Sequence, residues 1–383
     1  MSKILSFLCL ATMLILPSCR EEQVIFIPEE VEVTTPQFTS LIGFFVLNEG
    51  NMGSNKATLD YYNFRTGRYS RNVFASANPN VPKEMGDVGN DLGIYGNKLY
   101  AVINCSNKVD VMDKMSVKKI GQIDIPNCRF IKFYGGYAYV TSYAGPVEIS
   151  IDYKQRGYVA KVDTTTLEVV DTCVVGFQPD ELDIVNGKIY VANSGGYMVP
   201  NYENTVSVID IKTFSEESRI EIDINLQCCR ADRNGILWIS SRGDYYSTPS
   251  RLFAYDTRHQ RLIKSFDQNV SSMWLDGDSL YVIGSQFSYV TMKTEVSFGI
   301  INCSTMELVS TCFIADGTDA LLEMPYAVAV NPITKEIYVA DAKDYVSPGR
   351  LYCFSPEGIK LWDVRTGDIP AHFAFLGENN NEK

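Results

Sequence analysis

The sequence predicts an all-β protein, a seven-bladed β-propeller in which a C-terminal strand closes the N-terminal blade. A phrase of one apolar, one aromatic and one apolar residue recurs roughly every 40–55 residues, which is the period of propeller blades. The chain also ends on one apolar strand, which fits the strand missing from its first repeat. Aromatic residues, which favour strands, make up 12% of the chain, and long helical periods are absent.

The aromatic residue marks the second strand of each unit, and a hairpin turn precedes it. Turns such as Asn186-Gly187 and Gly135-Gly136 supply the positive φ angles that tight β-hairpins need. The aromatic positions are Phe45, Tyr100, Tyr139, Tyr190, Trp238, Tyr281 and Tyr338.

The third strand of each unit ends in an Asn, Asp or Ser residue. Such a side chain can accept a hydrogen bond from the backbone two residues on, and it therefore opens the next turn. A fourth strand follows, for example over Leu167–Val175 or Leu308–Phe313, so the unit is four short antiparallel strands and six whole units run from about Asn90 to about Val364. The residues that end the third strands are Asn63, Asp113, Asp163, Asp210, Asp256, Asn302 and Ser355.

The remaining blade is divided between the two ends of the propeller, which we place at residues 41–376. Three strands are expected at the start, over Phe44–Asn48, Ala57–Asn63 and Gly67–Phe74, and one at the end, over His372–Leu376. Their pairing closes the ring and removes an open sheet edge. A β-sandwich with irregular repeats is the alternative.

The first residues are typical of a targeting segment rather than of a fold. Lys3 precedes the apolar run Ile4–Leu16, which is too short for an ordinary transmembrane helix. Leu16-Pro17-Ser18-Cys19 resembles the bacterial lipobox, in which the cysteine is lipidated; an ordinary secretory signal is the alternative. We therefore expect a lipoprotein signal peptide over residues 1–18, a lipidated tether over residues 19–40 and a disordered tail over residues 377–383.

Composition argues against several classes of function. The formal charge of −12 makes the protein a poor candidate for binding nucleic acid or lying on an anionic membrane. The chain has 2 His residues, His259 and His372, so no metal site rich in histidine is expected and a Ser-His-Asp triad would need one of the two. Phosphate-binding, dinucleotide-binding and EF-hand motifs are absent. Carboxylate pairs such as Asp180-Glu181 leave a glycosidase-like or lyase-like site open.

Eight cysteines follow Cys19. An extracellular location permits disulfides, but connectivity cannot be read from sequence. Cys105 and Cys128 are placed where they could meet at one rim, and most of the others fall within strands, where cysteine behaves as a small apolar residue.

Candidate ligand-binding residues lie in the links between second and third strands and between blades, which are long and unequal, whereas the turns between first and second strands are uniformly tight. Variable loops over a rigid scaffold usually carry function. Tyr combines a flat apolar body with a hydroxyl, and amides can pair with amides or hydroxyls of a ligand. Packing of loop against loop is the alternative for any single Tyr. The loop candidates are Asn48, Glu49, Asn51, Tyr143, Tyr197, Tyr202, Arg242, Tyr245, Phe287 and Tyr345.

A second group of candidates lies near the start of the innermost strands, beside phrases such as Pro126-Asn127 and Pro179-Asp180. These residues are placed to approach the mouth of the central channel, unless they are merely solvated neighbours of a proline turn. They are Asn90, Asp91, Arg129, Glu181, Arg230, Tyr326 and His372.

The chain resembles the YncE-like β-propeller lipoproteins of Bacteroidetes. The resemblance rests on Phe45-Val46-Leu47-Asn48-Glu49-Gly50-Asn51, on the second strands, and on Gly367-Asp368-Ile369-Pro370-Ala371-His372-Phe373. Cys19-Arg20-Glu21-Glu22 also resembles the export tag of lipoproteins displayed on the outer surface of these bacteria. The chain is most similar to the BtuG-type proteins of this group, and the resemblance implies a surface lipoprotein that captures cobalamin (vitamin B12) and passes it to a TonB-dependent outer-membrane transporter of BtuB type.

The expected function is therefore non-enzymatic capture, without a resident cofactor or metal, by a protein lipid-anchored in the outer membrane and facing the cell exterior. Two alternatives stay open. One is a surface glycan-binding lipoprotein, which exposed Trp would favour. The other is a propeller enzyme acting on sugars or lactones, which a coherent cluster of carboxylates or a metal at the channel mouth would favour.

Overall fold

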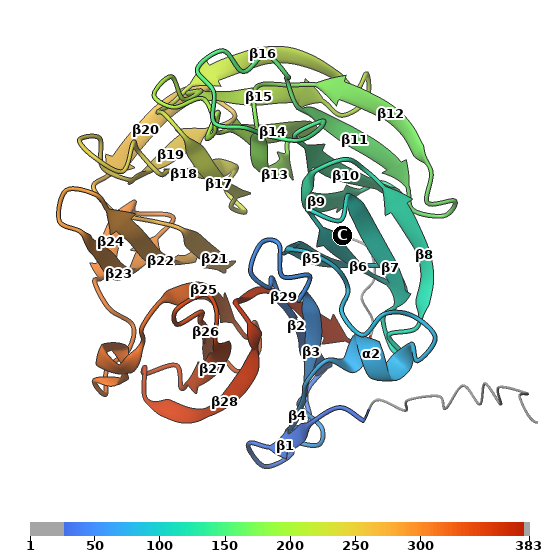
Figure 1. Ribbon diagram of the computed structural model, residues 1–383. Coiled ribbons are helices and arrows are strands. Elements are labelled where there is room, and N and C mark those ends of the chain that lie inside the picture. Colours follow the sequence, from blue (N-terminus) through green and yellow to red (C-terminus); the bar gives the residue numbers. More distant parts are fainter. Residues whose placement is uncertain (1–26, 379–383) are drawn as a thin grey trace, which may run out of the picture.

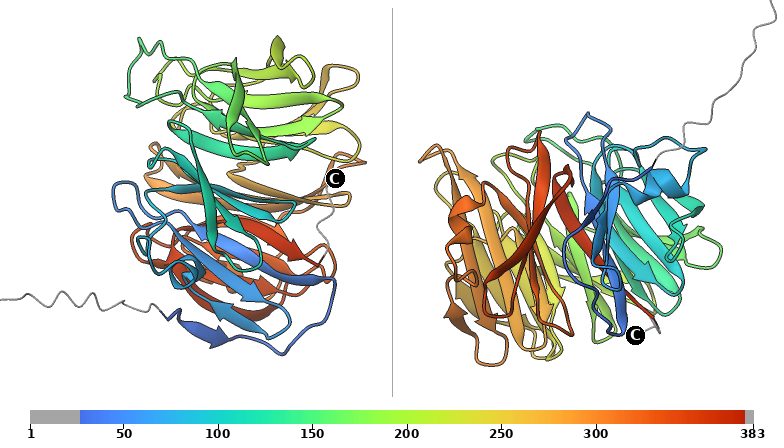
Figure 2. Two further views of the ribbon diagram at one scale, coloured as in Figure 1. Left: turned by 90° about the vertical axis from the view of Figure 1, so that its right-hand side faces the viewer. Right: turned by 90° about the horizontal axis from the view of Figure 1, so that it is seen from below.

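Seven antiparallel sheets stand in a ring around a central axis in the computed structural model, which describes residues 27–378 (Figure 1). Six sheets have four strands, and one sheet joins N-terminal strands to the C-terminal strand. In side view the sheets stand side by side and form a thick disc (Figure 2). The predicted seven-bladed propeller is confirmed.

The strands follow the expected repeat, each blade running outward from the channel. The blade shared by the two ends contains β29 (Pro370–Gly377), β2 (Leu41–Asn48), β3 (Thr58–Asn63), β4 (Arg68–Ser70) and β1 (Glu30–Glu32). The next three blades are β5 (Gly89–Tyr95), β6 (Lys98–Ile103), β7 (Lys108–Asp113), β8 (Lys119–Asp124); β9 (Cys128–Tyr134), β10 (Tyr137–Ser142), β11 (Tyr158–Asp163), β12 (Val169–Val174); and β13 (Pro179–Val185), β14 (Lys188–Asn193), β15 (Thr205–Asp210), β16 (Ser215–Glu221).

The last three blades have the same order. They are β17 (Leu226–Ala231), β18 (Ile236–Ser241), β19 (Arg251–Asp256), β20 (Arg261–Phe266); β21 (Ser272–Asp276), β22 (Ser279–Ser288), β23 (Lys293–Asn302), β24 (Glu307–Ser310); and β25 (Pro325–Val330), β26 (Ile337–Asp341), β27 (Pro348–Phe354), β28 (Lys360–Asp368). A short helix, α2 (Val73–Ala77), follows β4, and a 3-10 turn, η1 (Thr318–Leu321), precedes β25.

The aromatic residues of the repeated phrase form the core between neighbouring blades. Tyr100 and Tyr338 are fully buried, and Trp238 packs in a cluster that joins β18 to residues of the following blade, such as Met273. Tyr281 is the partly buried member of the set. Burying large rings between sheets gives each blade apolar contact with both neighbours, so the repeat in the sequence specifies the ring.

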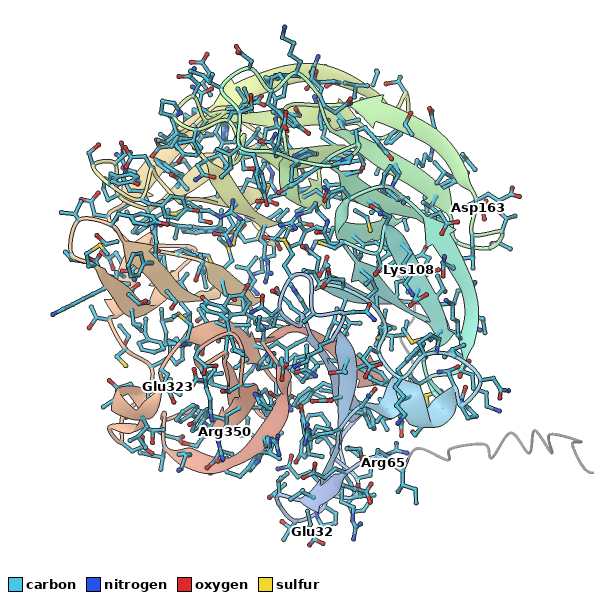
Figure 3. The ribbon with its side chains drawn as sticks, in the orientation of Figure 1. Glu32, Arg65, Lys108, Asp163, Glu323 and Arg350 are labelled. Carbon is cyan, nitrogen blue, oxygen red and sulfur yellow. The ribbon has the colours of Figure 1, made fainter. Side chains whose placement is uncertain are left out.

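The Asn, Asp and Ser side chains that end the third strands accept backbone hydrogen bonds from the turns that follow, as expected. Asp113 Oδ1 accepts from the amides of Met115 and Ser116 at 3.1 and 2.8 Å, and all seven positions follow this pattern. One of them, Asp163, lies at the outer edge of the disc (Figure 3). The first-to-second-strand turns use positive φ angles, for example 52° and 74° at Asn186 and Gly187.

Closure of the ring follows the predicted pairing. β29 pairs with β2 in antiparallel register, with Phe45 opposite Ala374 and Leu47 opposite His372. The strand His372–Leu376 is therefore the innermost strand of the shared blade.

Two segments near the N-terminus differ from the prediction. The expected strand Gly67–Phe74 ends early, because Asn72 adopts a left-handed conformation and its side chain caps α2 through a hydrogen bond from the Ala75 amide. Part of the expected tether, β1, adds a fifth strand on β4, where Arg68 and Glu30 form an ion pair of 2.8 Å. The sequence Glu30-Val31-Glu32 alone does not predict that this segment pairs with the edge strand β4, because the pairing depends on charged partners far along the chain.

All eight cysteines among the described residues are free thiols. Cys128, which was expected beside Cys105, is buried and contacts the backbone carbonyls of Ile103 and Lys108. Most of the other cysteines are buried among apolar side chains, as predicted. The signal peptide, Cys19 and tail residues 379–383 lie outside the described residues. Between residues 27 and 378 the structure has no helix that is both long and apolar enough to span a membrane.

Candidate ligand-binding face around the channel mouth

A cavity of about 190 Å³ opens where the innermost strands begin, and we call it the channel mouth. It brings together eight of the residues singled out in the sequence, from six blades. The eight are Glu49, Asn90, Arg129, Glu181, Arg230, Arg242, Tyr326 and His372. Residues that sequence reasoning did not select also line it, including Gln227, Ser271 and Phe130.

Irregular pairing at the start of the innermost strands directs these side chains to the mouth. The register of β5, β13, β17 and β25 against their partners shifts near the first residues, for instance between Pro179 and Leu182. A bulge bends the strand and re-aims a side chain. Polar residues after the proline turns therefore face the channel instead of the core.

Asp180 is the centre of the first charged group at the mouth. Its Oδ1 accepts from Arg129 Nε and Nη2 at 3.2 and 3.1 Å, and Arg242 Nη1 lies 2.8 Å from its Oδ2. The Tyr143 hydroxyl donates to Oδ1 at 2.7 Å. Burial opposes ionisation of Asp180, but the two guanidinium groups and Tyr143 outweigh it and hold the pKa of Asp180 below its ordinary value.

Arg230 and Glu181 form a second charged group. Arg230 Nε donates to Glu181 Oε1 at 2.8 Å, and the Cys229 amide donates to Oε2 at 2.9 Å. Arg230 also donates to the backbone carbonyl of Met273 in the next blade. Both charges are thus paired and hydrogen-bonded, as a buried ion pair requires.

A third group joins the two ends of the chain. His372 Nε2 lies 3.1 Å from Glu49 Oε1, His372 Nδ1 lies 3.9 Å from Asp91 Oδ1, and Tyr326 donates to Glu49 Oε2 at 3.0 Å. Burial raises the pKa of Asp91, an effect that His372 and the Ile131 amide partly offset. Burial and the neighbouring Glu49 also raise the pKa of Tyr326, so its hydroxyl remains a donor.

Exposed and partly exposed aromatic rings gather beside the mouth, on loops and on the end of β22, and we call Tyr202, Tyr245, Tyr246, Phe287 and Tyr289 the aromatic loop cluster. Tyr246 and Tyr289 stack with centroids 5.1 Å apart and planes at 16°, and Phe287 meets Tyr289 edge-on at 5.2 Å. Tyr246 and Tyr289 are 62% and 52% exposed. Burial and the neighbouring Tyr245 raise the pKa of Tyr202, which places it beside the same rings.

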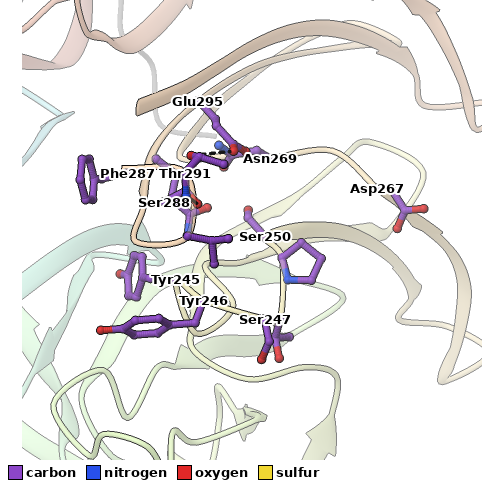
Figure 4. Close-up of a pocket in the computed structure, with 14 residues that line it drawn as sticks. Tyr245, Tyr246, Ser247, Ser250, Asp267, Asn269, Phe287, Ser288, Thr291 and Glu295 are labelled. Atoms are coloured by element: carbon purple, nitrogen blue, oxygen red, sulfur yellow. Dashed lines mark hydrogen bonds between the residues drawn. The ribbon is translucent and has the colours of Figure 1, made fainter. Parts of the chain in front are cut away.

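A second cavity, of about 430 Å³, adjoins this cluster between the loops of the fifth and sixth blades (Figure 4). The rings of Tyr245, Tyr246 and Phe287 lie on one side of it and Asp267 lies on the other. Gln286 from its wall donates to the backbone carbonyl of Arg242 at 2.6 Å. The cavity and the channel mouth are therefore neighbours on one face.

Several predicted residues support this face without being free to contact a ligand. Asn48 is fully buried and donates to Thr58 Oγ1 at 3.1 Å, so its expected role in binding is corrected to a structural one. Tyr143 is buried under Arg129, whose guanidinium carbon lies 4.9 Å from its ring centroid, and Tyr197 meets Tyr143 edge-on at 6.4 Å. The Tyr143 and Tyr197 rings therefore pack one loop against another.

Asn51 and Tyr345 also hold loops together. Asn51 Nδ2 donates to the Tyr345 carbonyl at 3.2 Å, and the Tyr345 ring meets Tyr326 edge-on at 5.8 Å. They form a wall behind Tyr326 at the mouth.

The sequence analysis named Asp180 only as part of a carboxylate pair, and it did not include Asp180, Tyr246 or Tyr289 among the ligand-binding candidates. Asp180 directly follows Pro179 at the start of an innermost strand, a position that already marked its neighbour Glu181. Tyr246 and Tyr289 lie in the same aromatic loops as Tyr245 and Phe287. Two sequence features could have identified these residues: the position directly after a proline for Asp180, and the high density of aromatic residues in the loops for Tyr246 and Tyr289.

The part of the chain that the structure describes contains no group of three or more His, Cys, Asp or Glu side chains arranged to hold a metal ion. The mouth instead combines arginine donors, carboxylate acceptors and one imidazole. Such a site can bind a polar ligand, and the Glu49–His372–Asp91 group can also exchange protons.

The fold and the site define a β-propeller protein with a charged channel mouth and an aromatic loop face. The chain belongs to the family described as a domain of unknown function (DUF5074), whose model matches residues 42–353. No curated protein matches the chain.

Solved structures resemble the chain in fold alone. A quinonprotein alcohol dehydrogenase-like protein from Bacteroides thetaiotaomicron VPI-5482 has a TM-score of 0.58 and 13% identity, with 88% of this chain and 79% of that chain covered. Hydrazine synthase from Kuenenia stuttgartiensis has a TM-score of 0.56 and 15% identity, with 70% and 77% covered. A chain of the mitotic checkpoint complex has a TM-score of 0.56 and 12% identity, with 74% and 82% covered.

Proposed function

We propose that this protein is a non-enzymatic capture protein, which binds cobalamin on the outer surface of the cell and delivers it to a TonB-dependent outer-membrane transporter of BtuB type. The observation that carries the proposal is the meeting of exposed aromatic rings with arginine and amide donors on one face of the propeller. The similarity to BtuG-type lipoproteins supplies the identity of the ligand.

The dimensions of the face fit a large ligand that rests on it. Pockets that enclose drug-sized ligands have volumes of roughly 300–1,000 Å³, whereas the channel mouth measures about 190 Å³. The mouth is thus suited to one protruding group, and the loops are suited to the flat corrin ring. Tyr246 and Tyr289 offer ring faces for stacking, and Gln227 at the mouth carries an amide of the kind found at the corrin edge.

Anchoring at Cys19 is part of the same proposal. A lipid on Cys19, followed by the export-tag-like Arg20-Glu21-Glu22, would hold the propeller at the outer surface beside a transporter. In a Cys19→Ala variant the protein should leave the membrane fraction, while the unchanged protein should stay there and be cut by protease added to whole cells. A variant that stays in the membrane fraction contradicts the lipid anchor.

Equilibrium dialysis separates the capture proposal from glycan binding. We expect the protein to retain cyanocobalamin and to ignore a panel of glycans, because its Trp residues are poorly placed as sugar platforms: Trp238 and Trp362 are buried, and Trp274 packs partly buried against the core. If the protein retains a glycan but not cyanocobalamin, the ligand is a glycan rather than cobalamin, and the aromatic face remains the candidate binding surface.

The Glu49–His372–Asp91 group favours one second candidate, an enzyme acting on sugars or lactones. An imidazole between two carboxylates is suited to general acid–base catalysis, and His372 lies 3.1 Å from Glu49 Oε1. Turnover of a sugar or lactone that disappears in His372→Ala, while the folded fraction is retained, would support this candidate over capture. The capture proposal predicts no such turnover.

A further inference from the structure

Two guanidinium groups share one carboxylate beside the channel mouth. Arg129 and Arg242 both contact Asp180, and Tyr143 adds a neutral hydroxyl. Two positive charges and one negative charge leave this group with an excess of one positive charge, in a protein whose formal net charge is −12. The excess is local and nearly enclosed, because the Arg129 and Arg242 side chains are 19% and 23% exposed.

Both arginines retain unused donors. Among residues 27–378, the hydrogen bonds and ion pairs employ Nε and Nη2 of Arg129 and Nη1 of Arg242, and they leave Arg129 Nη1 and Arg242 Nε and Nη2 without an acceptor. Both residues line the channel mouth. A guanidinium fork with free N–H groups matches the geometry of a carboxylate or phosphate oxygen pair.

The other carboxylates at the mouth have partners of their own. Glu181 accepts from Arg230 and the Cys229 amide, and Glu49 accepts from Tyr326 and contacts His372. Asp180 is the carboxylate that contacts both Arg129 and Arg242. Within the group formed by Arg129, Arg242 and Asp180, one more anion would balance the excess positive charge.

We propose that Arg129 and Arg242 form a subsite for one anionic group of the ligand, a phosphate ester or a carboxylate. The identity of the whole ligand rests on the proposed function: cobalamin carries one phosphodiester, in its nucleotide loop, and this is the group that enters the mouth. Arg129 is held by its contact with the Tyr143 ring and Arg242 by its ion pair of 2.8 Å with Asp180, so both forks are fixed before the ligand arrives.

Inorganic phosphate tests the subsite without cobalamin. We expect phosphate to raise the thermal midpoint of the full-length protein above that in chloride of equal ionic strength, and to lose this effect in Arg242→Lys, which keeps the charge and loses the fork. Arg233→Lys is the matched control, because Arg233 pairs with Asp278 in an exposed position, and it should respond as the unchanged protein does. An equal midpoint in phosphate and chloride overturns the subsite.

Corrinoids test whether the Arg129–Arg242 subsite contributes to the proposed capture of cobalamin. Cyanocobalamin should bind at least about tenfold more tightly than dicyanocobinamide, which lacks the phosphodiester, and Arg242→Lys should reduce this ratio towards one. A ratio that Arg242→Lys leaves unchanged overturns the subsite while the capture proposal stands. A response to phosphate without any corrinoid binding supports the subsite and contradicts the capture of cobalamin.

Discussion

His372 and Glu49 are in contact at the channel mouth, with Nε2 and Oε1 3.1 Å apart, although 323 positions separate them in the chain. His372 belongs to β29 and Glu49 directly follows β2, the strand that β29 pairs with. Closing the ring therefore also assembles part of the candidate site. Loss of closure should remove ligand binding together with stability.

Phe44 tests the closure. It is fully buried and its ring lies 4.6 Å from Tyr338 and 6.0 Å from Phe373, so it joins β2 to β26 and β29. Phe44→Ala should lower the free energy of unfolding by about 3–5 kcal/mol, measured by urea denaturation. Phe287→Ala, at an exposed position near the end of β22, should change it by less than about 0.5 kcal/mol. Equal urea midpoints for Phe44→Ala and Phe287→Ala would contradict the proposed role of Phe44 in closing the ring.

Asp244 makes one loop of the aromatic face sensitive to acid. Burial opposes its ionisation, but the amides of Thr248, Tyr246 and Ser247 donate to Oδ1 at 2.8–2.9 Å and lower the pKa of Asp244 to about 2. Because the folded pKa lies below the unfolded value near 3.8, ionised Asp244 stabilises the fold above that pH and the contribution is lost as pH falls towards 2.

The stability difference between the protein and Asp244→Asn should thus be constant above about pH 5 and vanish near pH 2. Urea denaturation at a series of pH values measures it. Asp344→Asn, in the matching loop where the Ser347 and Val346 amides lower the pKa of Asp344 to about 2, should behave alike. A stability difference that grows as the pH falls would contradict the expectation that ionised Asp244 stabilises the folded state.

Tyr246 and Tyr289 should contribute to ligand binding and little to the fold. Both rings are more than half exposed, so Tyr246→Ala and Tyr289→Ala should leave the thermal midpoint nearly unchanged. Each should weaken cyanocobalamin binding roughly tenfold, the effect of losing about 1.4 kcal/mol. Tyr134→Ala is the matched control, because Tyr134 is 48% exposed in a tight hairpin at the far end of an innermost strand. If Tyr134→Ala weakens binding equally, the aromatic loop cluster is not the ligand face.

Free thiols give a chemical check on the structure. Cys105 is exposed and the remaining cysteines among residues 27–378 are buried or partly buried. Although Cys105 is exposed, partial desolvation of its thiol and the neighbouring Asp87 raise the pKa of Cys105, so its reaction with a thiol reagent should accelerate as pH rises. We expect one fast phase in the native protein, lost in Cys105→Ser, and an unchanged thermal midpoint on adding reductant. A reductant-dependent midpoint would reveal a disulfide.

The fold was predictable because its determinants are local and repeated. Trp238 and Tyr338 indicate buried second strands, and Asp113 and Asp256 indicate the turns that follow third strands. β1 and α2 were not predictable, because one depends on an ion pair with Arg68 and the other on the left-handed conformation of Asn72. Neither property leaves a periodic signal.

The site was predictable in composition and less so in arrangement. The start of each innermost strand marked Arg129, Glu181 and His372, all of which reach the mouth. Which Tyr residues pack and which stay exposed depended on loop conformation, and Asp180 gains its importance from Arg242, which lies one blade further along the chain. Contacts between blades carry no signature in a single sequence.

Calorimetric titration of the protein with cyanocobalamin tests the central claim most directly. The account predicts heat of binding that saturates at one ligand per protein, because the propeller offers one channel mouth bordered by the aromatic loop cluster. Absence of heat, with no shift of the thermal midpoint at saturating cyanocobalamin, would contradict cobalamin capture and leave the seven-bladed propeller as it is.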